Sequence, residues 1–467
     1  MSPFVLAVAL LLCFLYVVKN RRSRSKLPPS PAWCLPLLGH LHLIGRLPHR
    51  SLHELHLRYG GGGGLLLLQL GRRRTLVVST AAAAADLFKN HDLAFSSRPH
   101  NAAAHKQTYG SRNVSFAPYG DHWRQAKRIV VVHLLSARRV EAFAPVRAAE
   151  AAALVSRARR AAEAREAVEL KELVYGYTNA VVTRAAAGAA GATAGRLRQL
   201  LAHSTTLVDD LLPDAAARVL RRVTGLEKKI DDMNADWDRF LSEIVAENKH
   251  KASKPGQGGD IVDVLLQLRE KEGAKGFELT DDGIKAITKD MIAAATETTA
   301  VTLEWAMVEL ARNPRVTAKL QDEIARVAGG SEQVAVMEAE LNGMPYLRAV
   351  IKEVLRLHPP LPLLLPRESM AAAAVQGGRY EIPAQTALLV NAWAIGRDPA
   401  AWDAPEEFGP ERFLGSDGPA AVDFWGTDYQ LLPFGTGRCP IDFHLALTQW
   451  ADPSTTRRST AQKQPSP

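Results

Sequence analysis

The stretch from Thr280 to Arg312 constrains the fold most, because it predicts a single very long helix. Thr280 and the two aspartates after it suit a helix N-terminus, and Asn313-Pro314 would end the helix. At 1.5 Å per residue, such a helix is on the order of 50 Å long. Its middle part, Met291 to Val308, is largely apolar. A helix of this length and composition usually crosses the core, so the other elements are expected to pack around it.

The remaining chain predicts a mainly α protein with minor β structure. Residues 120–250 are rich in Ala, Leu and Arg and have helical periodicity, whereas 249–259 is a polar stretch typical of a surface loop. With 467 residues, 47% of them hydrophobic, the chain can bury a large core in one or two domains. Short strands are expected at Leu65–Leu70, Thr75–Val78 and Ala387–Val390. The low-complexity runs Gly60–Gly64 and Ala81–Ala85 suggest no chemistry.

The N-terminus predicts a signal anchor. Phe4 to Val18 is uninterrupted apolar sequence, slightly short of a hydrocarbon core of about 30 Å, and basic residues follow it at once. A cleaved signal peptide is the alternative, but it would place its charges before the apolar run and small residues after it. We therefore expect a transmembrane helix over 1–18 and a basic, Pro-rich hinge over 19–36. The basic flank should stay cytoplasmic.

Charge and cysteine content exclude some classes of protein. The net charge of +9 favours anionic partners in general, but the chain has no basic stripe interleaved with aromatics and no zinc-finger spacing. No nucleic-acid partner is therefore predicted. The three cysteines, Cys13, Cys34 and Cys439, are too scattered for a disulfide framework. A reducing compartment fits, in which one important cysteine would act as a thiolate.

Two faces of the long helix carry polar residues of interest. Heptad spacing places Asp290, Glu297 and Glu304 on one stripe, which is expected to be a solvated edge. Thr298 falls on the neighbouring apolar stripe, where a buried hydroxyl needs a hydrogen-bond partner. Its hydroxyl could bond back to a carbonyl one turn earlier. Alternatively, Glu297 and Thr298 form an acid–alcohol pair that lines a cavity and delivers protons.

Three Glu-x-x-Arg pairs lie on predicted helices, each with the two residues on one helix face. Two of them are expected to be ordinary surface pairs, namely Glu309/Arg312 and Glu323/Arg326. Glu353/Arg356 differs in context, because His358-Pro359-Pro360 follows it and Pro410-Glu411-Arg412-Phe413 comes later. Arg412 could join the pair in a buried network, which is favourable only if every charge has a partner.

The order of these motifs resembles that of a microsomal cytochrome P450, most closely the plant A-type enzymes. The resemblance extends from the N-terminus to about Pro440. The motifs that carry it, after the anchor and hinge, are Trp123-Arg124-Gln125-Ala126-Lys127-Arg128, Ala294-Ala295-Thr296-Glu297-Thr298-Thr299, Glu353-x-x-Arg356, Pro410-Glu411-Arg412-Phe413 and Phe434-Gly435-Thr436-Gly437-Arg438-Cys439-Pro440.

The resemblance implies the cytochrome P450 fold and a haem-thiolate monooxygenase that uses haem b. Cys439 would be the axial thiolate of the haem iron, in a loop with Phe434 and Gly437. Glu297 and Thr298 would relay protons. Glu353, Arg356 and Arg412 would form a structural triad behind the haem. The candidates for the haem propionates are Trp123, Arg124, Lys127, Arg128, Arg367 and Arg438. For Lys127 and Arg128, an exposed helix face is the alternative.

The family further implies a reaction that inserts one oxygen atom of O₂ into a small lipophilic substrate, here a plant secondary metabolite. Electrons would come from NADPH through NADPH–cytochrome P450 reductase. Asn101–Pro118 and Leu361–Pro366 match regions that border substrate in the family. The catalytic domain would span residues 37–443 and face the cytosol from the endoplasmic reticulum membrane, held by a single transmembrane pass.

The chain departs from the family pattern in three places. Ala295 stands where the family has Gly. The family pattern Phe-x-x-Gly-x-Arg-x-Cys-x-Gly is two residues shorter here between Gly437 and Cys439, and Ile441 replaces its last Gly. The tail, 444–467, is polar, divergent and expected to be disordered, so the fold would be incomplete at its C-terminal end.

A frameshift, a misjoined exon or a decayed gene copy would each explain the tail. The alternative function is therefore a haem-less or inactive relative, at most a membrane-tethered binding protein. A helical protein whose motifs are coincidental is a further alternative, which the ordered set of motifs disfavours.

Overall fold

The computed structural model describes residues 26–188, 195–197, 199–201, 225–251, 259–273, 278–328, 338–415, 421–424 and 426–436. The predicted anchor over 1–18, the first part of the hinge, Gly437, Arg438, Cys439 and the tail lie outside the described residues. No helix within the described ranges is long and apolar enough to cross a membrane.

Helices make up most of the described chain, as predicted. Their bounds are α2 (Pro48–Tyr59), α3 (Ala81–Asn90), α4 (Ala102–Gln107), α5 (Asp121–Ile129), α6 (Ala137–Ala142), α7 (Ala144–Ala164), α8 (Leu170–Ala187), α11 (Leu226–Lys251), α12 (Ile261–Gly273), α13 (Asp281–Arg312), α14 (Pro314–Val327), α15 (Pro345–Leu357) and α16 (Ala392–Ile395). Shorter 3-10 or π turns occur at Leu41–Leu43, Asp92–Phe95, Val130–Leu134, Glu338–Gly343 and Pro410–Phe413.

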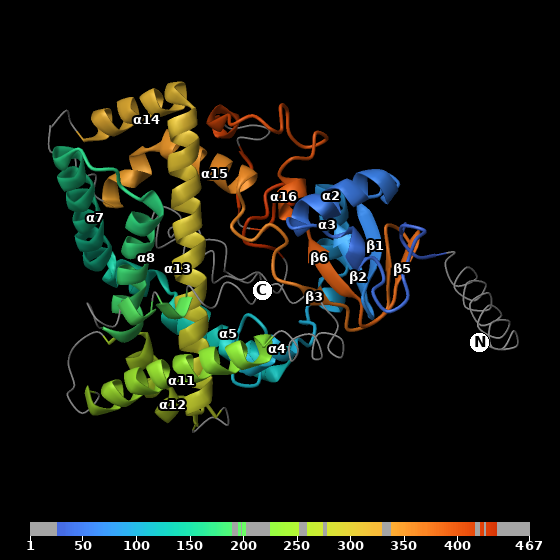
Figure 1. Ribbon diagram of the computed structural model, residues 1–467, viewed down its shortest axis with the longest axis horizontal. Coiled ribbons are helices and arrows are strands. Elements are labelled where there is room, and N and C mark those ends of the chain that lie inside the picture. Colours follow the sequence, from blue (N-terminus) through green and yellow to red (C-terminus); the bar gives the residue numbers. More distant parts are fainter. Residues whose placement is uncertain are drawn as a thin grey trace, which may run out of the picture.

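The predicted long helix is confirmed as α13, which passes through the helical part of the molecule (Figure 1). The Thr280 hydroxyl accepts a hydrogen bond from the Gly283 N–H at 3.2 Å and caps the helix, and α14 begins at Pro314. Helices α8, α11, α12 and α15 all pack against α13. Its N-terminal half contributes Met291 and Ala295 to the largest hydrophobic cluster of the described chain.

A smaller β region lies beside the helices. The three predicted strands are confirmed and form most of one sheet, with strand order β1-β2-β6-β3. In it β1 and β2 are antiparallel, β2 and β6 are parallel, and β6 and β3 are antiparallel. The sequence interpretation missed β3 and the separate β4–β5 hairpin. The strand bounds are β1 (Leu65–Leu70), β2 (Arg73–Val78), β3 (Arg367–Glu368), β4 (Ala373–Val375), β5 (Tyr380–Ile382) and β6 (Ala387–Val390).

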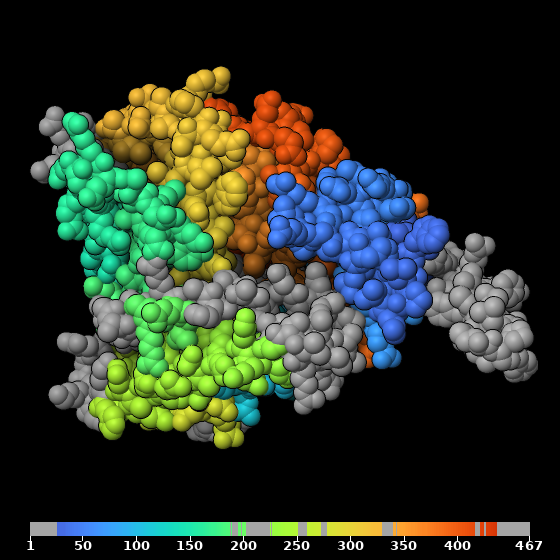
Figure 2. Space-filling view, viewed as in Figure 1, coloured from blue at the N-terminus to red at the C-terminus, as the bar shows by residue number. Residues whose placement is uncertain are grey.

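The two low-complexity runs have structural roles at the start of this sheet. Gly61, Gly62 and Gly64 adopt left-handed backbone conformations in the turn between α2 and β1, which glycine adopts at little steric cost. The alanine run begins α3, whose small buried Ala83 and Ala84 let the helix approach the sheet closely. In the space-filling view, the N-terminal part of this β region with α2 (blue) lies toward the right, and α7, α8 and α11 (green to yellow-green) lie toward the left (Figure 2).

Candidate active site

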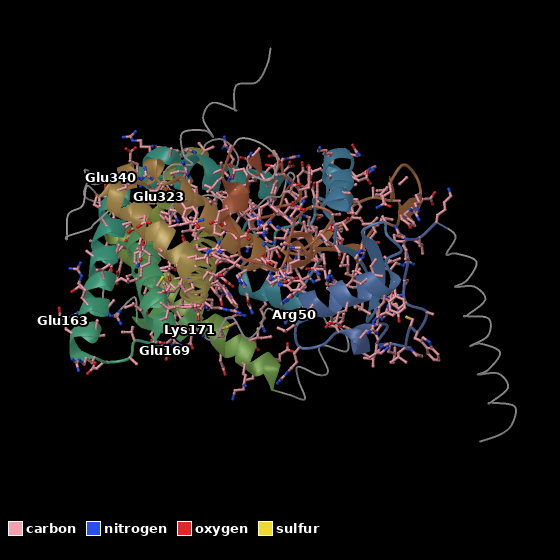
Figure 3. The ribbon with its side chains drawn as sticks, turned by 90° about the horizontal axis from the view of Figure 1, so that it is seen from above. Arg50, Glu163, Glu169, Lys171, Glu323 and Glu340 are labelled. Carbon is pink, nitrogen blue, oxygen red and sulfur yellow. The ribbon has the colours of Figure 1, made fainter. Side chains whose placement is uncertain are left out.

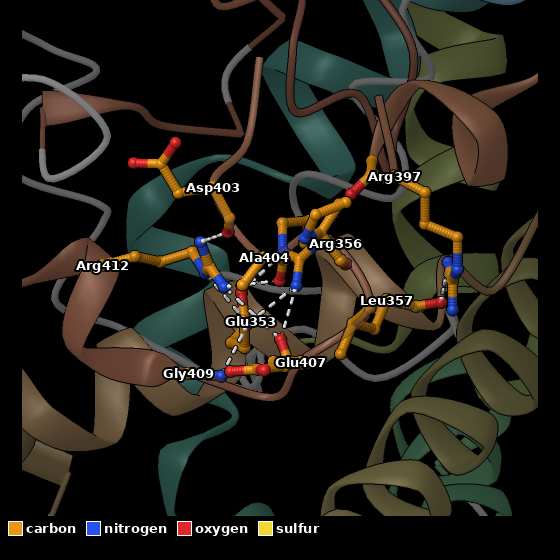
Figure 4. A network of polar contacts seen from close by, with 11 residues as sticks. Glu353, Arg356, Leu357, Arg397, Asp403, Ala404, Glu407, Gly409 and Arg412 are labelled. Atoms are coloured by element: carbon orange, nitrogen blue, oxygen red, sulfur yellow. Dashed lines mark hydrogen bonds and ion pairs between the residues drawn. The ribbon is translucent and has the colours of Figure 1, made fainter. Parts of the chain in front are cut away.

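Glu353, Arg356 and Arg412 form a buried ionic network (Figure 4). The side chains of Glu353 and Arg356 are 0% exposed. The Arg356 guanidinium donates to both Glu353 oxygens, with Nε···Oε2 at 2.7 Å and Nη2···Oε1 at 2.8 Å. Glu353 Oε1 also accepts from Arg412 Nε at 3.1 Å and from the Gly409 N–H at 2.8 Å. The structure therefore brings together the three residues that the sequence grouped.

The network ties α15 to a distant loop through the other donors of its arginines. Backbone carbonyls accept these hydrogen bonds: Gly396 and Pro405 at 2.6 Å and Glu407 at 3.0 Å from Arg356, and Asp403 at 2.7 Å from Arg412. Each buried charge thus has both an ionic partner and hydrogen bonds, the condition under which a buried ion pair is tolerated.

The prediction that the other two Glu-x-x-Arg pairs are ordinary surface pairs is wrong for their glutamates. Both Glu323 and Glu309 are buried. Glu323, on α14 (labelled in Figure 3), accepts the Tyr346 and Leu347 N–H groups at 2.8 Å each and so caps the first turn of α15. Glu309 accepts from or donates to the His358 ring at 2.8 Å, depending on protonation. Sequence spacing identifies the helix face of such a residue but not its partner on another element.

The hydroxyl of Thr298 donates to the Ala294 carbonyl, one turn earlier on α13, at 2.6 Å. This is the bond that the sequence left open as the simpler alternative. Thr296 donates to the Ile292 carbonyl in the same way, at 2.9 Å. The Thr298 oxygen keeps its lone pairs as acceptors, so the back-bond leaves its use in proton transfer open.

Glu297 is half-buried on α13 and is influenced by α8. Burial raises the pKa of its carboxyl group, and the Lys171 ammonium partly offsets that rise. Lys171 lies near the start of α8, labelled in Figure 3. On the same helix, burial first and the Glu297 charge second raise the pKa of Tyr175 to about 12. A raised pKa makes this carboxyl group a better proton donor than an exposed glutamate would be as a carboxylate, which suits a proton relay.

The environment of Asp290 contradicts the prediction that its stripe of α13 is a solvated edge. Burial raises the pKa of its carboxyl group, and its oxygens accept from the Asn113 side chain and from the backbone N–H groups of Val114 and Ser115 at 2.9–3.0 Å. The prediction failed because the segment that covers this edge of α13 lies more than 170 positions earlier in the chain.

Arg367, a predicted propionate partner, is buried at the edge of the sheet in β3. Its guanidinium donates to the Thr436 carbonyl and lies 4.6 Å from the centroid of the Phe88 ring. Asp92 lies 3.8 Å away from it. Arg367 therefore contacts the loop that leads to Cys439.

Arg98 is a second buried arginine, which the sequence interpretation missed. It donates to the Leu365 and Pro366 carbonyls at 3.1 and 2.9 Å. The adjacent Ser97 forms a β-bridge with Glu368, so Arg98 and Arg367 lie on neighbouring backbone. Two buried arginines on neighbouring backbone fit a dianionic ligand such as haem with its two propionates. The Arg-Pro dipeptide after Phe95-Ser96-Ser97 was the only available signal.

The α5 candidates differ in burial. Trp123 is buried and donates its indole N–H to the Val114 carbonyl at 3.2 Å. The Lys127 ammonium lies 5.2 Å from the Trp123 ring centroid. Arg124 is exposed and pairs with Asp121, and Arg128 is also exposed. The structure thus brings Trp123 and Lys127 together and leaves the two arginines on the surface.

The loop before the cysteine is described up to Thr436. Phe434 is buried and packs edge-on against Phe424, with ring centroids 5.6 Å apart. Gly435 has a φ of 88°, a conformation that favours glycine, and Thr436 is buried and donates to the Gly426 carbonyl. The remaining predicted haem residues, Gly437, Arg438 and Cys439, lie outside the described residues.

Comparisons with known proteins identify the family of this chain. Residues 28–439 match the family described as "Cytochrome P450". The chain is 39% identical over 464 residues to "Cytochrome P450 71A2" of Solanum melongena, covering 96% of this chain and 89% of that protein. It is 39% identical to "4-hydroxyphenylacetaldehyde oxime monooxygenase" of Sorghum bicolor, with 93% and 84% covered. A zebra fish cytochrome P450 structure with progesterone has the same fold, with a TM-score of 0.70 at 23% identity, covering 87% of this chain and 91% of that one.

The chain belongs to the cytochrome P450 family. Its resemblance to plant members is confirmed, and so is the mainly helical cytochrome P450 fold with minor sheet. It is a cytochrome P450 monooxygenase, and haem is the cofactor that the family implies.

Proposed function

We propose that this monooxygenase inserts one oxygen atom of O₂ into a small lipophilic plant secondary metabolite. The observation that carries the proposal is the pair of buried guanidinium groups of Arg98 and Arg367, next to the loop that leads to Cys439. Relatives named "4-hydroxyphenylacetaldehyde oxime monooxygenase", of Sorghum bicolor, and "Salviol synthase", of Salvia pomifera, support the reaction and its substrate class. Bound haem would supply O₂ activation, with the thiolate increasing electron density at the iron.

The residues proposed to hold haem come from several elements. Cys439 would supply the axial thiolate, with Phe434 and Gly437 shaping its loop. Arg98 and Arg367 would face the propionates from the interior, since carboxylates take guanidinium donors. Trp123 stays a candidate from the sequence, although its one indole N–H donates to the Val114 carbonyl in this structure. Arg438, Lys127, Arg124 and Arg128 remain candidates of the same kind, the last two at exposed positions.

Glu297 and Thr298 are proposed to move protons. Burial favours the protonated Glu297 carboxyl group, which can then donate. The Thr298 oxygen can accept a hydrogen bond while its own hydrogen is donated to the Ala294 carbonyl. The Glu353–Arg356–Arg412 network would hold α15 and the 396–412 loop rigid beneath the cofactor.

The reduced, CO-bound absorbance spectrum of the expressed full chain tests this proposal. A Soret band at the position of thiolate-ligated haem, lost in Cys439→Ala, is the expected result. Arg98→Ala and Arg367→Ala should each lower haem occupancy, whereas Arg326→Ala, at an exposed position of α14, should not. Absence of haem absorbance in the wild type would contradict the active enzyme.

One specific feature favours the alternative of a haem-less relative. Only Arg438 separates Gly437 from Cys439, whereas the family pattern has two more residues there. Such a chain would keep the helical body and bind lipophilic ligands without turnover. The same spectrum separates the two functions. The DNA sequence just past the Cys439 codon would decide whether the tail is genuine, because the expected helix would appear in another reading frame if it is not.

We further propose that residues 1–18 anchor the protein in the endoplasmic reticulum membrane, that 19–36 form a hinge, and that the catalytic domain, 37–443, faces the cytosol before a divergent tail, 444–467. NADPH–cytochrome P450 reductase would then supply electrons from the same membrane. Carbonate extraction of a chain that starts after Pro31 should release it into the supernatant, whereas the full chain should stay with the membranes. A truncated chain that remains membrane-bound would contradict a single anchor.

A further inference from the structure

The Asp290 carboxylate is enclosed by a short segment from the other end of the domain. Its Oδ1 accepts from Asn113 Nδ2 at 3.0 Å, and its Oδ2 accepts from the Val114 and Ser115 N–H groups at 3.0 and 2.9 Å. The Asn113 side-chain oxygen meanwhile accepts from the Phe116 N–H at 3.2 Å. Residues 113–116 thus wrap around one partly buried carboxylate.

The same segment is fastened to α13 at two further points. The Lys289 ammonium, next to Asp290 on the helix, donates to the Gln107 carbonyl at 3.0 Å. Arg112 donates to the hydroxyl of Thr280, the helix cap, at 2.6 Å. Asp290 differs from these two contacts because it is bonded to two consecutive backbone amides. It therefore determines the path of the backbone and not only the distance of the backbone from the helix.

The segment is connected to residues of the candidate active site by a shared hydrophobic cluster and by a hydrogen bond to Trp123. Val114 and Ala294 both pack against the hydrophobic cluster that contains Met291 and Ala295 of α13. The Val114 carbonyl accepts the Trp123 indole N–H at 3.2 Å, while its N–H group is held by Asp290. One peptide therefore connects the carboxylate to a proposed haem contact.

We propose that Asp290 is a positioning residue, which fixes the backbone of residues 113–115 against α13 and thereby sets both the pocket wall beside Ala294 and the orientation of Trp123. The part that concerns pocket and haem rests on the proposed function. The part that concerns the backbone does not, so the two can fail separately.

The hydrogen-bond pattern provides a reciprocal test. In Asp290→Asn, the introduced carboxamide can still accept from Val114 and Ser115, but its NH₂ group faces the NH₂ group of Asn113. In Asn113→Asp, two carboxylates face each other. The double variant D290N/N113D restores a donor opposite an acceptor, and the introduced carboxylate can still accept from Phe116. If Asp290 contributed only to the general stability of the fold, the double variant would not restore what each single variant loses.

Hydrogen–deuterium exchange of the full chain, followed by mass spectrometry, measures the effect. Peptides covering 107–118 should exchange roughly tenfold faster or more in each single variant, since a hydrogen bond to a charged group is lost. The double variant should return to within about twofold of the wild type. Peptides from α15 should be unchanged in all variants. Asp282→Asn, the same substitution at an exposed position of α13, is the matched control and should exchange as the wild type does.

The haem-loaded chain gives the second readout. Imidazole, which reaches the iron without filling the pocket, and 4-phenylimidazole, which must fit against its wall, are titrated by absorbance. D290N should change the dissociation constant of 4-phenylimidazole by about fivefold or more and that of imidazole by less than about twofold, and the double variant should restore both.

Unchanged exchange at 107–118 in D290N, or a double variant no better than the singles, overturns the positioning role. Restored exchange together with unaltered 4-phenylimidazole binding overturns its link to the pocket. If the wild type takes up no haem, the proposed function fails, and the exchange experiment still decides whether Asp290 fixes the segment.

Discussion

At the residue scale, three identical Glu-x-x-Arg spacings have three different environments. Arg356 is buried on Glu353, whereas Arg326 is 68% exposed and lies 3.8 Å from Glu323. Removing one partner of a buried ion pair leaves an uncompensated charge and costs about 3–5 kcal/mol, whereas an exposed pair contributes about 0–1 kcal/mol. Arg356→Ala should therefore lower the free energy of unfolding by several kcal/mol, and Arg326→Ala by less than about 0.5 kcal/mol.

Urea unfolding midpoints of the two variants, compared at equal denaturant slopes, test this difference. Glu353→Gln is a useful third variant, because it keeps the shape of the side chain and removes the charge opposite both Arg356 and Arg412. Similar midpoints for Arg356→Ala and Arg326→Ala would mean that burial does not distinguish the pairs.

Lys289 predicts a pH dependence of stability. Burial lowers the pKa of its ammonium group from 10.5 to about 8, although the group donates to the Gln107 carbonyl. Below pH 8 both the folded and the unfolded chain hold the proton, and the folded state bears the full cost of the buried charge. Between pH 8 and 10.5 the folded chain has released the proton and the unfolded chain has not, so stability rises with pH.

The free energy of unfolding of the wild type minus that of Lys289→Met should thus rise by about 3 kcal/mol from pH 7.5 to 10.5. Taking the difference cancels the other groups that titrate in this range. Urea unfolding at a series of pH values measures it, and a difference that is constant across the series would show that Lys289 keeps its ordinary pKa.

At the element scale, the glycine run before β1 offers a matched pair. Gly62 and Gly64 both have left-handed backbones, with φ of 77° and 72°. A Cβ on Gly62 would meet open space, whereas one on Gly64 would lie 2.0 Å from the Thr80 hydroxyl oxygen and 2.8 Å from the Ala83 Cβ. Thr80 caps α3, so the clash falls on the junction between the sheet and that helix.

Gly62→Ala should cost about 1–2 kcal/mol, the strain of a left-handed alanine. Gly64→Ala should cost a further 1–3 kcal/mol or so, because a methyl group must be forced into packed structure. Thermal or urea unfolding of the two variants tests the order. Equal losses of unfolding free energy in the two variants would mean that the Thr80 side chain moves aside without an energetic cost.

Elements with a strong local pattern could be predicted from the sequence. The caps at Thr280 and Asn313 fixed the ends of α13, and apolar runs of four to six residues gave β1, β2 and β6. The two- and three-residue strands β3, β4 and β5 are too short to carry a periodicity. Periodicity assigns a residue to a face, not to a partner, so the buried environments of Asp290, Glu309 and Glu323 could not be predicted.

In the candidate site too, some residues could be grouped from the sequence and others could not. Resemblance grouped Glu353, Arg356 and Arg412, and the structure brings them into one network. Arg98 and Arg367 are separated by 269 positions, and the pairing of Ser97 with Glu368, together with the Arg98 bonds to the Leu365 and Pro366 carbonyls, brings their backbones together. Such a juxtaposition depends on long-range topology, which a single sequence does not display.

At the scale of the whole molecule, the loop that ends at Cys439 has the position of the family's haem-ligand loop but not its length. The mainly helical body around α13 and the small β region follow the family architecture. Thr436 is held against Arg367, which fixes where the loop starts. The remaining span to Cys439 is two residues shorter than the family pattern, and each extended residue covers about 3.3 Å. Haem uptake should therefore be limited by the reach of this loop rather than by the stability of the body.

Inserting one alanine on each side of Arg438 restores the family spacing and should raise haem occupancy several-fold. The measurement is the ratio of Soret to protein absorbance in purified protein, together with the position of the reduced, CO-bound band. Two alanines inserted between Gly61 and Gly62, in an open turn far from the loop in sequence, control for insertion as such and should leave the ratio unchanged. If the wild type already shows full thiolate-ligated haem and the insertion at Arg438 lowers it, the short loop is itself an adapted haem loop, and the family spacing is not required for ligation in this chain.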